Sequence, residues 1–517
     1  MQTDDCQPSP KRISSGAEYI ESLRQRELLI FYLGDRIANP VDHPVIRPSI
    51  NAVAKTYDLE LSHPELALTR SPLTGEAINR FLHIAISQDD LVQQNKMQRR
   101  LGQLTGTCFQ RCVGMDALNA LYSVTYEIDE AKGTDYHSKL RNFISGLHRQ
   151  NGVVGGAMTD VKGDRSKAPH EQEDPDLFVH VVRKDSQGVW ISGAKAHQTG
   201  CINSHWLIVM PTMRLRNEDK ACASVGAIPV DAEGITYVYG RQSCDTRSLE
   251  AHTIDQGNSQ FGGQEAMVIF KEVFIPWERV FLNGEVEFAA MLVERFTCYH
   301  RRSYVCKSGV GDVLIGAAAA IADYNGVPQA SHIRDKLVEM THLNETIYST
   351  GIASSYQSRA TSSGCFLNDE MIANVCKHHV TKMPYEIARL AQDLAGGLMV
   401  TLPSAADLEH PEVGPLIEKF LKAKPGTPTK DRMKILRLIE NMTLGRNAVG
   451  YLTESLHGAG SPQAQRIQIA RQMQLEEKKQ LAQELAGIAT PDPAPPPPDG
   501  YLERVFTPEK GNHSHGI

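Results

Sequence analysis

The sequence predicts an α+β protein in which an N-terminal helical domain, a middle antiparallel β domain and a C-terminal helical bundle follow one another. Apolar residues have mostly helical spacing up to about Leu147, and β-branched runs of strand length, separated by turns, follow Gly152. Helical spacing returns at about Val286 and continues to about Ile488. A chain of 517 residues is also too long for one small core, which favours about three units.

We expect the helical domain to span residues 1–150. Loops at 39–44 and 69–72 interrupt its helical spacing, and the most continuous helical stretch is Leu101–Tyr126. This stretch puts Cys108 and Cys112 on one helix.

The β domain is expected at residues 151–283. Apolar and β-branched runs separated by turns predict its strands. The runs are Leu177–Arg183, Val189–Ser192, Trp206–Met210, Ile235–Tyr239 and Val268–Phe274.

The C-terminal bundle is expected at residues 284–490, with helical spacing for instance at Ile333, Leu337 and Met340. Residues 491–517 form a proline-rich tail, and we expect it to be extended and disordered because consecutive prolines permit neither helix nor ladder.

The composition argues against nucleic-acid binding and membrane insertion. Apolar residues make up 41% of the chain and charged residues 22%, and a net charge of -7 provides no basic field for nucleic acid. No run of eighteen apolar residues occurs, and the N-terminus lacks the apolar core of a signal peptide. These features predict a cytoplasmic protein, whose ten cysteines are thiols or metal ligands rather than disulfides.

Cysteines and a histidine provide four soft ligands in two segments. Cys108 and Cys112 are four residues apart, and His300 is six residues before Cys306. Such a set suits an iron-sulfur cluster or a zinc ion. The alternative is that the thiols only pack as small apolar groups, as we expect for the seven cysteines without ligand spacing. These are Cys6, Cys201, Cys222, Cys244, Cys298, Cys365 and Cys376.

Five segments resemble the 4-hydroxybutyryl-CoA dehydratase family, within the 4-hydroxyphenylacetate 3-hydroxylase superfamily. They are TGTCFQRCVGMD at 105–116, GAKAHQTG at 193–200, YGRQSCDTR at 239–247, FGGQEA at 261–266 and TESLHGAGSPQAQR at 453–466. The resemblance extends from about Glu18 to Ile488. The order of the domains also resembles the acyl-CoA dehydrogenase architecture, a flavin fold.

The resemblance implies FAD and a [4Fe-4S] cluster bound by Cys108, Cys112, Cys306 and His300. One departure affects this set, because the family has one more residue between the histidine and the last cysteine. A six-residue step turns Cys306 away from His300 by roughly a third of a turn on a regular helix, so we expect a break or a non-α turn between them. Cys298 is the alternative ligand.

The resemblance also implies the flavin contacts. The segment that opens the β domain offers amides and Arg165 to phosphates, and Thr199 matches a threonine that contacts the flavin ring, although cross-strand packing is the ordinary role of such a residue. Gly396 and Gly397 match a glycine pair beside a neighbouring subunit's flavin, which implies a homotetramer with flavin at its interfaces; a helix cap is the alternative. The full set is Met158, Thr159, Asp160, Lys162, Gly163, Asp164, Arg165, His197, Gln198, Thr199, Gly396 and Gly397.

Five residues in the matching segments are candidates for proton chemistry. In the implied scheme His300 accepts a substrate proton, Tyr304 and Glu454 help to protonate the leaving hydroxyl, and Glu265 and Lys307 arrange the site. Each has an ordinary alternative as a solvated or satisfied residue, but Glu265 and Glu454 lie in short segments that contain glycines, where loops position functional groups.

The implied function is dehydration of 4-hydroxybutyryl-CoA, or a related short-chain hydroxyacyl-CoA, to crotonyl-CoA. The C3 proton is unactivated and beyond the reach of an ordinary side-chain base, so the resemblance implies a radical mechanism that uses FAD and the cluster. The same machinery should isomerise vinylacetyl-CoA to crotonyl-CoA, because that shift needs no loss of water. The alternatives are an FADH2-dependent phenol 3-monooxygenase without a cluster, and a homologue that only binds flavin or CoA esters.

Overall fold

The computed structural model describes residues 12–241, 246–250 and 252–488. Contacts group the chain into two units, Met1–Gln468 and Ile469–Ile517. The predicted tail at 491–517 lies outside the described residues, as do Cys6 and Cys244.

The N-terminal part of the chain is mainly helical, and its helices have clear end signals. Ser87 caps α4 by accepting a hydrogen bond from the Asp90 amide, and Gly106 ends that helix in the left-handed conformation. The helices are α1 Gly16–Ser22, α2 Arg47–Ser62, α3 Pro64–Ala67, α4 Gln88–Thr105, α5 Cys112–Lys132 and α6 Tyr136–Gln150.

The helical spacing predicts an all-helical segment here, but the structure also contains strands. They are β1 Leu29–Tyr32, β2 Asp35–Arg36, β3 Leu68–Arg70 and β4 Ala77–Asn79. β1 pairs in parallel with β10 of the middle region. The prediction failed here because a strand of four residues is stabilised by its partner in the sheet rather than by its own periodicity.

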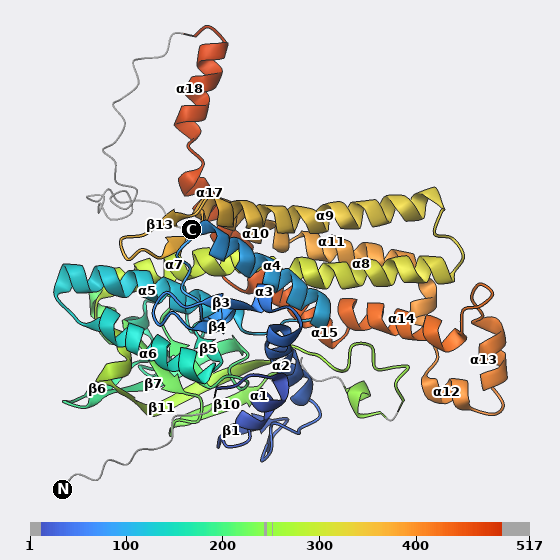
Figure 1. Ribbon diagram of the computed structural model, residues 1–517, viewed down its shortest axis with the longest axis horizontal. Coiled ribbons are helices and arrows are strands. Elements are labelled where there is room, and N and C mark those ends of the chain that lie inside the picture. The colour runs from blue at the N-terminus through green and yellow to red at the C-terminus, as the bar shows by residue number, and fades with distance from the viewer. Residues whose placement is uncertain (1–11, 242–245, 251, 489–517) are drawn as a thin grey trace. The chain divides into compact units, whose positions relative to one another are not determined.

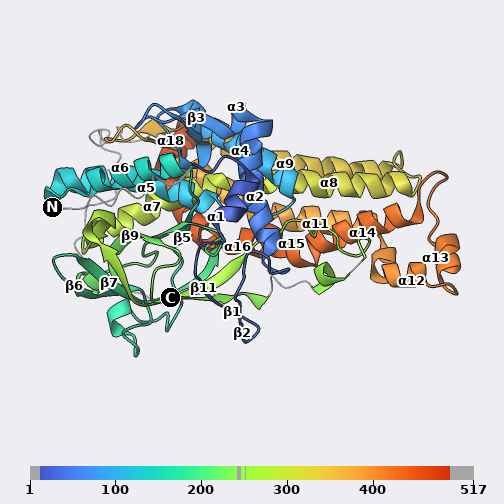
Figure 2. The same ribbon diagram turned by 60° about the horizontal axis from the view of Figure 1, so that its bottom comes forward.

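Two mixed sheets form the middle region, which lies against α5 and α6 (Figures 1 and 2). Their orders are β2-β1-β10-β11-β7-β6 and β12-β9-β8-β5. Most pairs are antiparallel as predicted, but β5 pairs in parallel with β8. The strands are β5 Val154–Ala157, β6 His180–Lys184, β7 Gly188–Thr199, β8 Trp206–Val209, β9 Ser224–Pro229, β10 Ile235–Tyr239, β11 Glu265–Pro276 and β12 Val280–Asn283.

The C-terminal part is helical, with one short hairpin. Helices α8, α9, α11 and α14 run alongside one another (Figure 1) and share one apolar core. The helices are α7 Val286–Ser303, α8 Cys306–Tyr324, α9 Ser331–Tyr356, α10 Glu370–Val380, α11 Met383–Ala395, α12 Ala405–Glu409, α13 Gly414–Phe420, α14 Thr429–Thr443, α15 Arg446–Ala448, α16 Glu454–His457, α17 Pro462–Gln472 and α18 Leu475–Leu485, and the hairpin is β13 Arg359–Ala360 with β14 Phe366–Leu367.

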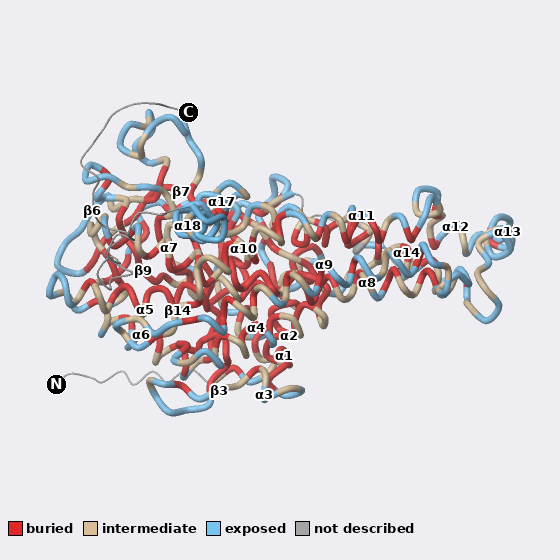
Figure 3. The backbone as a smooth tube through the Cα atoms, turned by 90° about the horizontal axis from the view of Figure 1, so that it is seen from above, coloured by how far each residue is buried: buried red, intermediate tan, exposed pale blue. Residues whose placement is uncertain are grey.

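Burial follows the sheets and the inner faces of the long helices (Figure 3). Among the described residues, one helical stretch, Val286–Tyr324, is long and apolar enough to cross a membrane, but 67% of its apolar window is buried inside the protein, as in a core helix. This stretch contains the break between α7 and α8.

Candidate active site

Cys108 and Cys112 lie where α4 ends and α5 begins. The prediction of one continuous helix through both was wrong, because α4 stops at Thr105 and only Cys112 is helical. Gly106 and Gln110 both have positive φ, +58° and +67°, which no α-helix accommodates. Cys112 is therefore the first residue of a 21-residue helix.

The predicted break between His300 and Cys306 is confirmed. α7 ends at Ser303, Tyr304 and Val305 form a turn, and α8 begins at Cys306. This turn puts Cys306, like Cys112, at the N-terminus of a long helix. Gly102 of α4 makes the close packing possible, since a Cβ there would lie 2.5 Å from the Cys306 carbonyl oxygen.

The three thiols of the predicted ligand set come together. A hydrogen bond between the two thiols lowers the pKa of Cys306 and raises that of Cys112. Burial raises the pKa of Cys108, which also interacts electrostatically with both. The Gln98 side-chain amide donates to the Cys112 sulfur over 3.3 Å. Cys298, the alternative ligand, instead donates to the Asn368 carbonyl.

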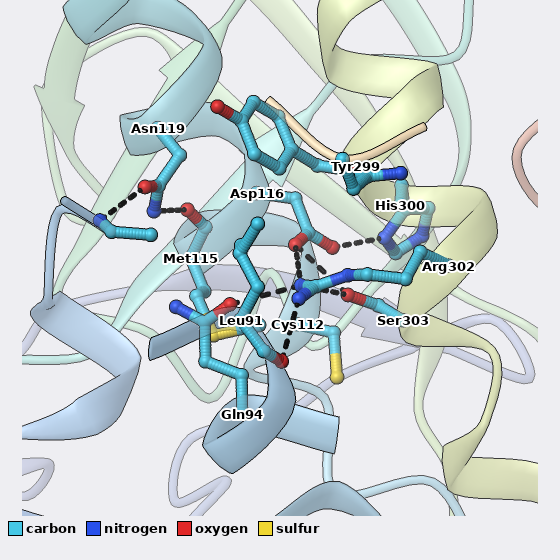
Figure 4. Close-up of polar contacts among 12 residues, drawn as sticks. Leu91, Gln94, Cys112, Met115, Asp116, Asn119, Tyr299, His300, Arg302 and Ser303 are labelled. Carbon is cyan, nitrogen blue, oxygen red and sulfur yellow. Dashed lines mark hydrogen bonds and ion pairs between the residues drawn. The ribbon is translucent and has the colours of Figure 1, made fainter. Parts of the chain in front are cut away.

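His300 is oriented by a buried carboxylate, Asp116 (Figure 4). Asp116 Oδ2 lies 2.8 Å from His300 Nδ1, and Asp116 Oδ1 accepts from the Ser303 hydroxyl over 2.9 Å. The buried Arg302 guanidinium lies 3.7 Å from the same Oδ1. This arrangement fixes the imidazole ring and leaves Nε2 as the atom available to a metal or substrate, as carboxylate–histidine pairs do in metal sites.

Three thiols and a histidine held in this way suit an iron-sulfur cluster by their chemistry. Within the described residues, no three His, Cys, Asp or Glu side chains are close enough together to hold one metal ion. The ligand set of Cys108, Cys112, Cys306 and His300 therefore stays a prediction.

Glu454 and Lys307 form a buried acid–base pair beside Cys108. Lys307 Nζ donates to the Gly450 carbonyl over 2.7 Å and lies 3.4 Å from Glu454 Oε2. Burial opposes the lysine's charge, but attraction to Glu454 and to the thiols raises its pKa above the usual value. Glu454 directly follows the π-helical turn Val449–Thr453, and π turns are frequent at functional sites.

Glu265 opens β11 opposite Thr199, the last residue of β7. The Thr199 hydroxyl donates to Glu265 Oε1 over 2.6 Å. Burial, and then repulsion by Glu454, raise the pKa of Glu265 well above its usual range. Burial and the nearby Glu454 therefore both disfavour the charged form of Glu265.

Tyr304 lies in the turn between α7 and α8, with its ring 5.4 Å from that of His300. Burial and the Glu454 charge raise its pKa well above 10, so the phenol keeps its proton. Its hydroxyl occupies space that only Gly458 leaves free, because a Cβ on that residue would overlap Tyr304 Oη. A side chain at position 458 would therefore clash with Tyr304, so this position needs a glycine.

Several of the predicted flavin residues have partners within the protein. Lys195 forms a buried ion pair with Asp160, which also accepts from the Thr212 amide over 2.7 Å. Gln198 accepts from the Met158 amide over 2.8 Å and donates to the Thr159 carbonyl over 2.9 Å. These contacts brace the end of β5, and Asp160 also lines the neighbouring cavity.

The rest of the segment borders a basic cavity of about 420 Å³. Asp164 accepts from the Ser166 amide in a local turn, and Gly163 has a φ of +54°. The exposed His197 also has a positive φ, +35°. The cations lining the cavity are Lys162, Arg165, Lys167, Arg214 and Arg216.

Gly396 and Gly397 lie at the end of α11, away from the groups described above. Both are exposed, and a Cβ on either would meet no atom within 4 Å. Gly396 caps α11 with a φ of +74°. Gly396 thus acts as a helix cap, and both glycines lie on the surface of the chain.

Comparisons with known proteins agree with the geometry. The 4-hydroxyphenylacetate 3-hydroxylase N-terminal model matches residues 15–282, and the C-terminal model matches residues 289–487. Over 488 residues the chain is 54% identical to the 4-hydroxybutyryl-CoA dehydratase/vinylacetyl-CoA-Δ-isomerase of Clostridium aminobutyricum, a match that covers 92% of this chain and 100% of that protein. The chain belongs to the 4-hydroxybutyryl-CoA dehydratase family.

Solved structures support the same family. An oxygen-tolerant archaeal 4-hydroxybutyryl-CoA dehydratase from N. maritimus is 65% identical, with a TM-score of 0.92 over 96% of this chain and 100% of that one. The FAD-complexed oxygenase component of 4-hydroxyphenylacetate 3-monooxygenase shares the fold, with a TM-score of 0.80 at 21% identity over 92% and 98% of the chains. The corresponding component from Thermus thermophilus is 24% identical over 83% of this chain and 88% of that protein. The monooxygenases are thus distant relatives of this dehydratase family member.

Some residues of this family member's site were not identified from the sequence. Asp116, Gln98 and Ser303 support the proposed cluster ligands, and Arg214 and Arg216 line the basic cavity. A signal existed only for Asp116, which is four residues after Cys112 on an otherwise apolar stretch. The others come from segments far away in the sequence or without any motif.

Proposed function

We propose that the protein dehydrates 4-hydroxybutyryl-CoA to crotonyl-CoA and water, and also isomerises vinylacetyl-CoA to crotonyl-CoA. The observation that carries the proposal is the gathering of three thiols, the Asp116-held His300 and the Glu454–Lys307 pair in one region of a dehydratase-family chain. A phenol monooxygenase has less support, since its relatives are at most 24% identical among those compared.

The proposed cofactors are FAD and a [4Fe-4S] cluster. Cys108, Cys112, Cys306 and His300 would hold the cluster, and the basic cavity would hold the flavin phosphates with Thr199 toward the ring. When bound, the flavin supplies one-electron chemistry for a radical mechanism, and the cluster supplies a Lewis acid for the substrate hydroxyl.

The chain's own residues would handle the protons. Dehydration removes one proton each from C2 and C3, returns one to C4 and releases the other with hydroxide as water. We assign His300 as the proton acceptor, with Asp116 fixing its ring; its one available lone pair, on Nε2, can accept a proton only while it does not bind the cluster. Tyr304 and Glu454 would protonate the leaving hydroxyl, Lys307 would hold Glu454, and Glu265, whose pKa is raised by burial, would help Lys307 to arrange the site.

We further propose a homotetramer in which Gly396 and Gly397 face a neighbouring subunit's flavin, and a cytoplasmic location. Both glycines are exposed and leave room for a close backbone approach. Sedimentation should give a tetramer, and an active monomer would contradict the assembly.

The ligand set can be tested with two serine variants. After anaerobic purification, Cys306→Ser should lose iron, sulfide and dehydration while keeping flavin, because its thiolate holds the cluster. Cys298→Ser is the matched control, since that buried thiol meets Asn368 instead. If only Cys298→Ser loses iron, Cys298 rather than Cys306 is the ligand. A wild-type protein that contains flavin but no iron would refute the dehydratase assignment.

A further inference from the structure

Lys377 of α10 is a buried lysine that the proposed reaction leaves unused. Its side chain is 0% exposed, and among the described residues no carboxylate oxygen lies within 4 Å of Nζ. Burying an ammonium group without a carboxylate is costly, and an apolar side chain of similar length would avoid that cost. The groups it does contact therefore indicate its role.

Those contacts are with Tyr304 and with Ser455, the residue that follows Glu454. Lys377 Nζ donates to the Ser455 carbonyl over 2.6 Å and lies 4.5 Å from the centre of the Tyr304 ring. Ser455 follows Glu454 directly, and its hydroxyl donates to the Gly450 carbonyl over 3.1 Å. The same Gly450 carbonyl accepts from Lys307, which lies 5.6 Å from the Tyr304 ring.

Two lysines from different helices thus hold the turn that carries Glu454. Lys307 of α8 holds the start of the turn at Gly450, and Lys377 holds it one turn later at Ser455. Both ammonium groups also lie near the ring of Tyr304, where cation–π attraction helps to hold the ring.

We propose that Lys377 is a positioning residue for dehydration, which aligns Tyr304 and Glu454 with the leaving hydroxyl of the substrate. The inference rests on the proposed function, because it assumes that these two groups protonate that hydroxyl. Isomerisation of vinylacetyl-CoA expels no hydroxide, so it depends less on this alignment.

The electrostatic surroundings of Lys377 agree with this role. Burial and the charges of Arg301 of α7 and Lys307 of α8 lower its pKa, Glu454 of α16 and the neighbouring Cys376 raise it, and the net result is a pKa of about 7. The amine therefore loses part of its charge near neutral pH, and a permanent cation at this position would retain the contacts.

The test compares the two activities of the reconstituted full-length protein. Lys377→Met should lower kcat for dehydration about 10- to 100-fold while retaining most of the isomerisation rate, KM, flavin and iron. Lys377→Arg should restore the ratio of the two rates, because a guanidinium group can keep the hydrogen bond and the ring contact. The ratio is independent of how much protein is folded, so it decides the outcome even if Lys377→Met folds poorly.

Cys376→Ala is the matched control on the same helix. Its buried sulfur donates to the Ile347 carbonyl and makes no contact with Tyr304, so the ratio should stay at the wild-type value. A wild-type ratio in Lys377→Met, or an equal fall in Cys376→Ala, would overturn the role of Lys377. Absence of both activities in the wild-type protein would instead refute the proposed function.

Discussion

Asp116 orients the His300 ring through one hydrogen bond, in which Oδ2 of Asp116 lies 2.8 Å from Nδ1 of His300. An imidazole that donates from Nδ1 has its lone pair on Nε2, where it can bind iron or accept a proton. Asparagine at this position is similar in size but can donate from its amide to Nδ1, which stabilises the opposite tautomer.

Asp116→Asn should therefore lower both iron content and dehydration, by roughly 10- to 100-fold in affinity or rate. Iron quantification and steady-state rates measure the two effects. Glu127→Gln is the matched control, because Glu127 also pairs α5 with α7, over 2.7 Å to Arg295, but lies outside the His300 network. Equal iron and activity in both variants would show that Asp116 has no role beyond stability.

Gly458 is a second residue whose importance depends on one neighbour, Tyr304. Gly458→Ala should reduce dehydration strongly, because the new methyl group would displace the phenol from Glu454. In a Tyr304→Phe background the overlapping hydroxyl is gone, so the same change should cost much less. A double-mutant cycle of dehydration rates measures the difference, and additive effects would show that the two residues act independently.

At the scale of elements, the site depends on how closely α4 and α8 approach. Gly309 of α8 packs on α4, where a Cβ would overlap the Arg99 carbonyl oxygen. Gly309→Ala should force the helices apart and cost about 1–3 kcal/mol of unfolding free energy. It should also weaken iron binding, since Cys306 lies at the start of α8.

Denaturant unfolding and iron quantification measure both effects. Gly316→Ala is the control on the same helix, because a Cβ there meets no atom within 4 Å. It should be neutral or stabilise the protein by up to about 1 kcal/mol. Similar losses in both variants would attribute the effect to helix composition rather than to close packing.

For the whole molecule, pH should affect stability through the buried His205. Burial, together with the charges of Arg26 and Arg111, lowers its pKa to about 3, so the folded protein keeps this ring neutral. The unfolded chain protonates it near pH 6.5. Its contribution to stability is therefore complete above pH 6.5 and is lost as pH falls toward 3, by about 1.4 kcal/mol per pH unit.

Urea unfolding midpoints between pH 7.5 and 4.5 test this dependence. His205→Gln should lower stability at pH 7.5, where the ring accepts from the Val153 amide over 2.9 Å, but should flatten the decline toward acid. His410→Gln, at an exposed position, serves as the control. An unchanged slope in His205→Gln would show that other groups control the acid response.

Sequence patterns predicted the long elements well and the short ones poorly. The strands β8, β10 and β11 and the helices of the C-terminal bundle follow from periodicity, because each buries a regular face. The strand β1 and the loop between α4 and α5 did not follow, since a sheet partner and two residues with positive φ determine them. The domain boundaries stay a prediction, and contacts join residues 1–468 into one unit.

The sequence by itself determined the family and the chemical types of its site residues, because motifs such as TGTCFQRCVGMD and TESLHGAGSPQAQR are contiguous. Only the tertiary structure decided which residues meet: Cys306 rather than Cys298 joins Cys112, and Asp160 pairs with Lys195 instead of remaining free. It alone brought Asp116 to His300 and Lys377 to Tyr304. The physical reason is that hydrogen bonds and burial depend on distances in space between segments that lie up to several hundred residues apart in the chain.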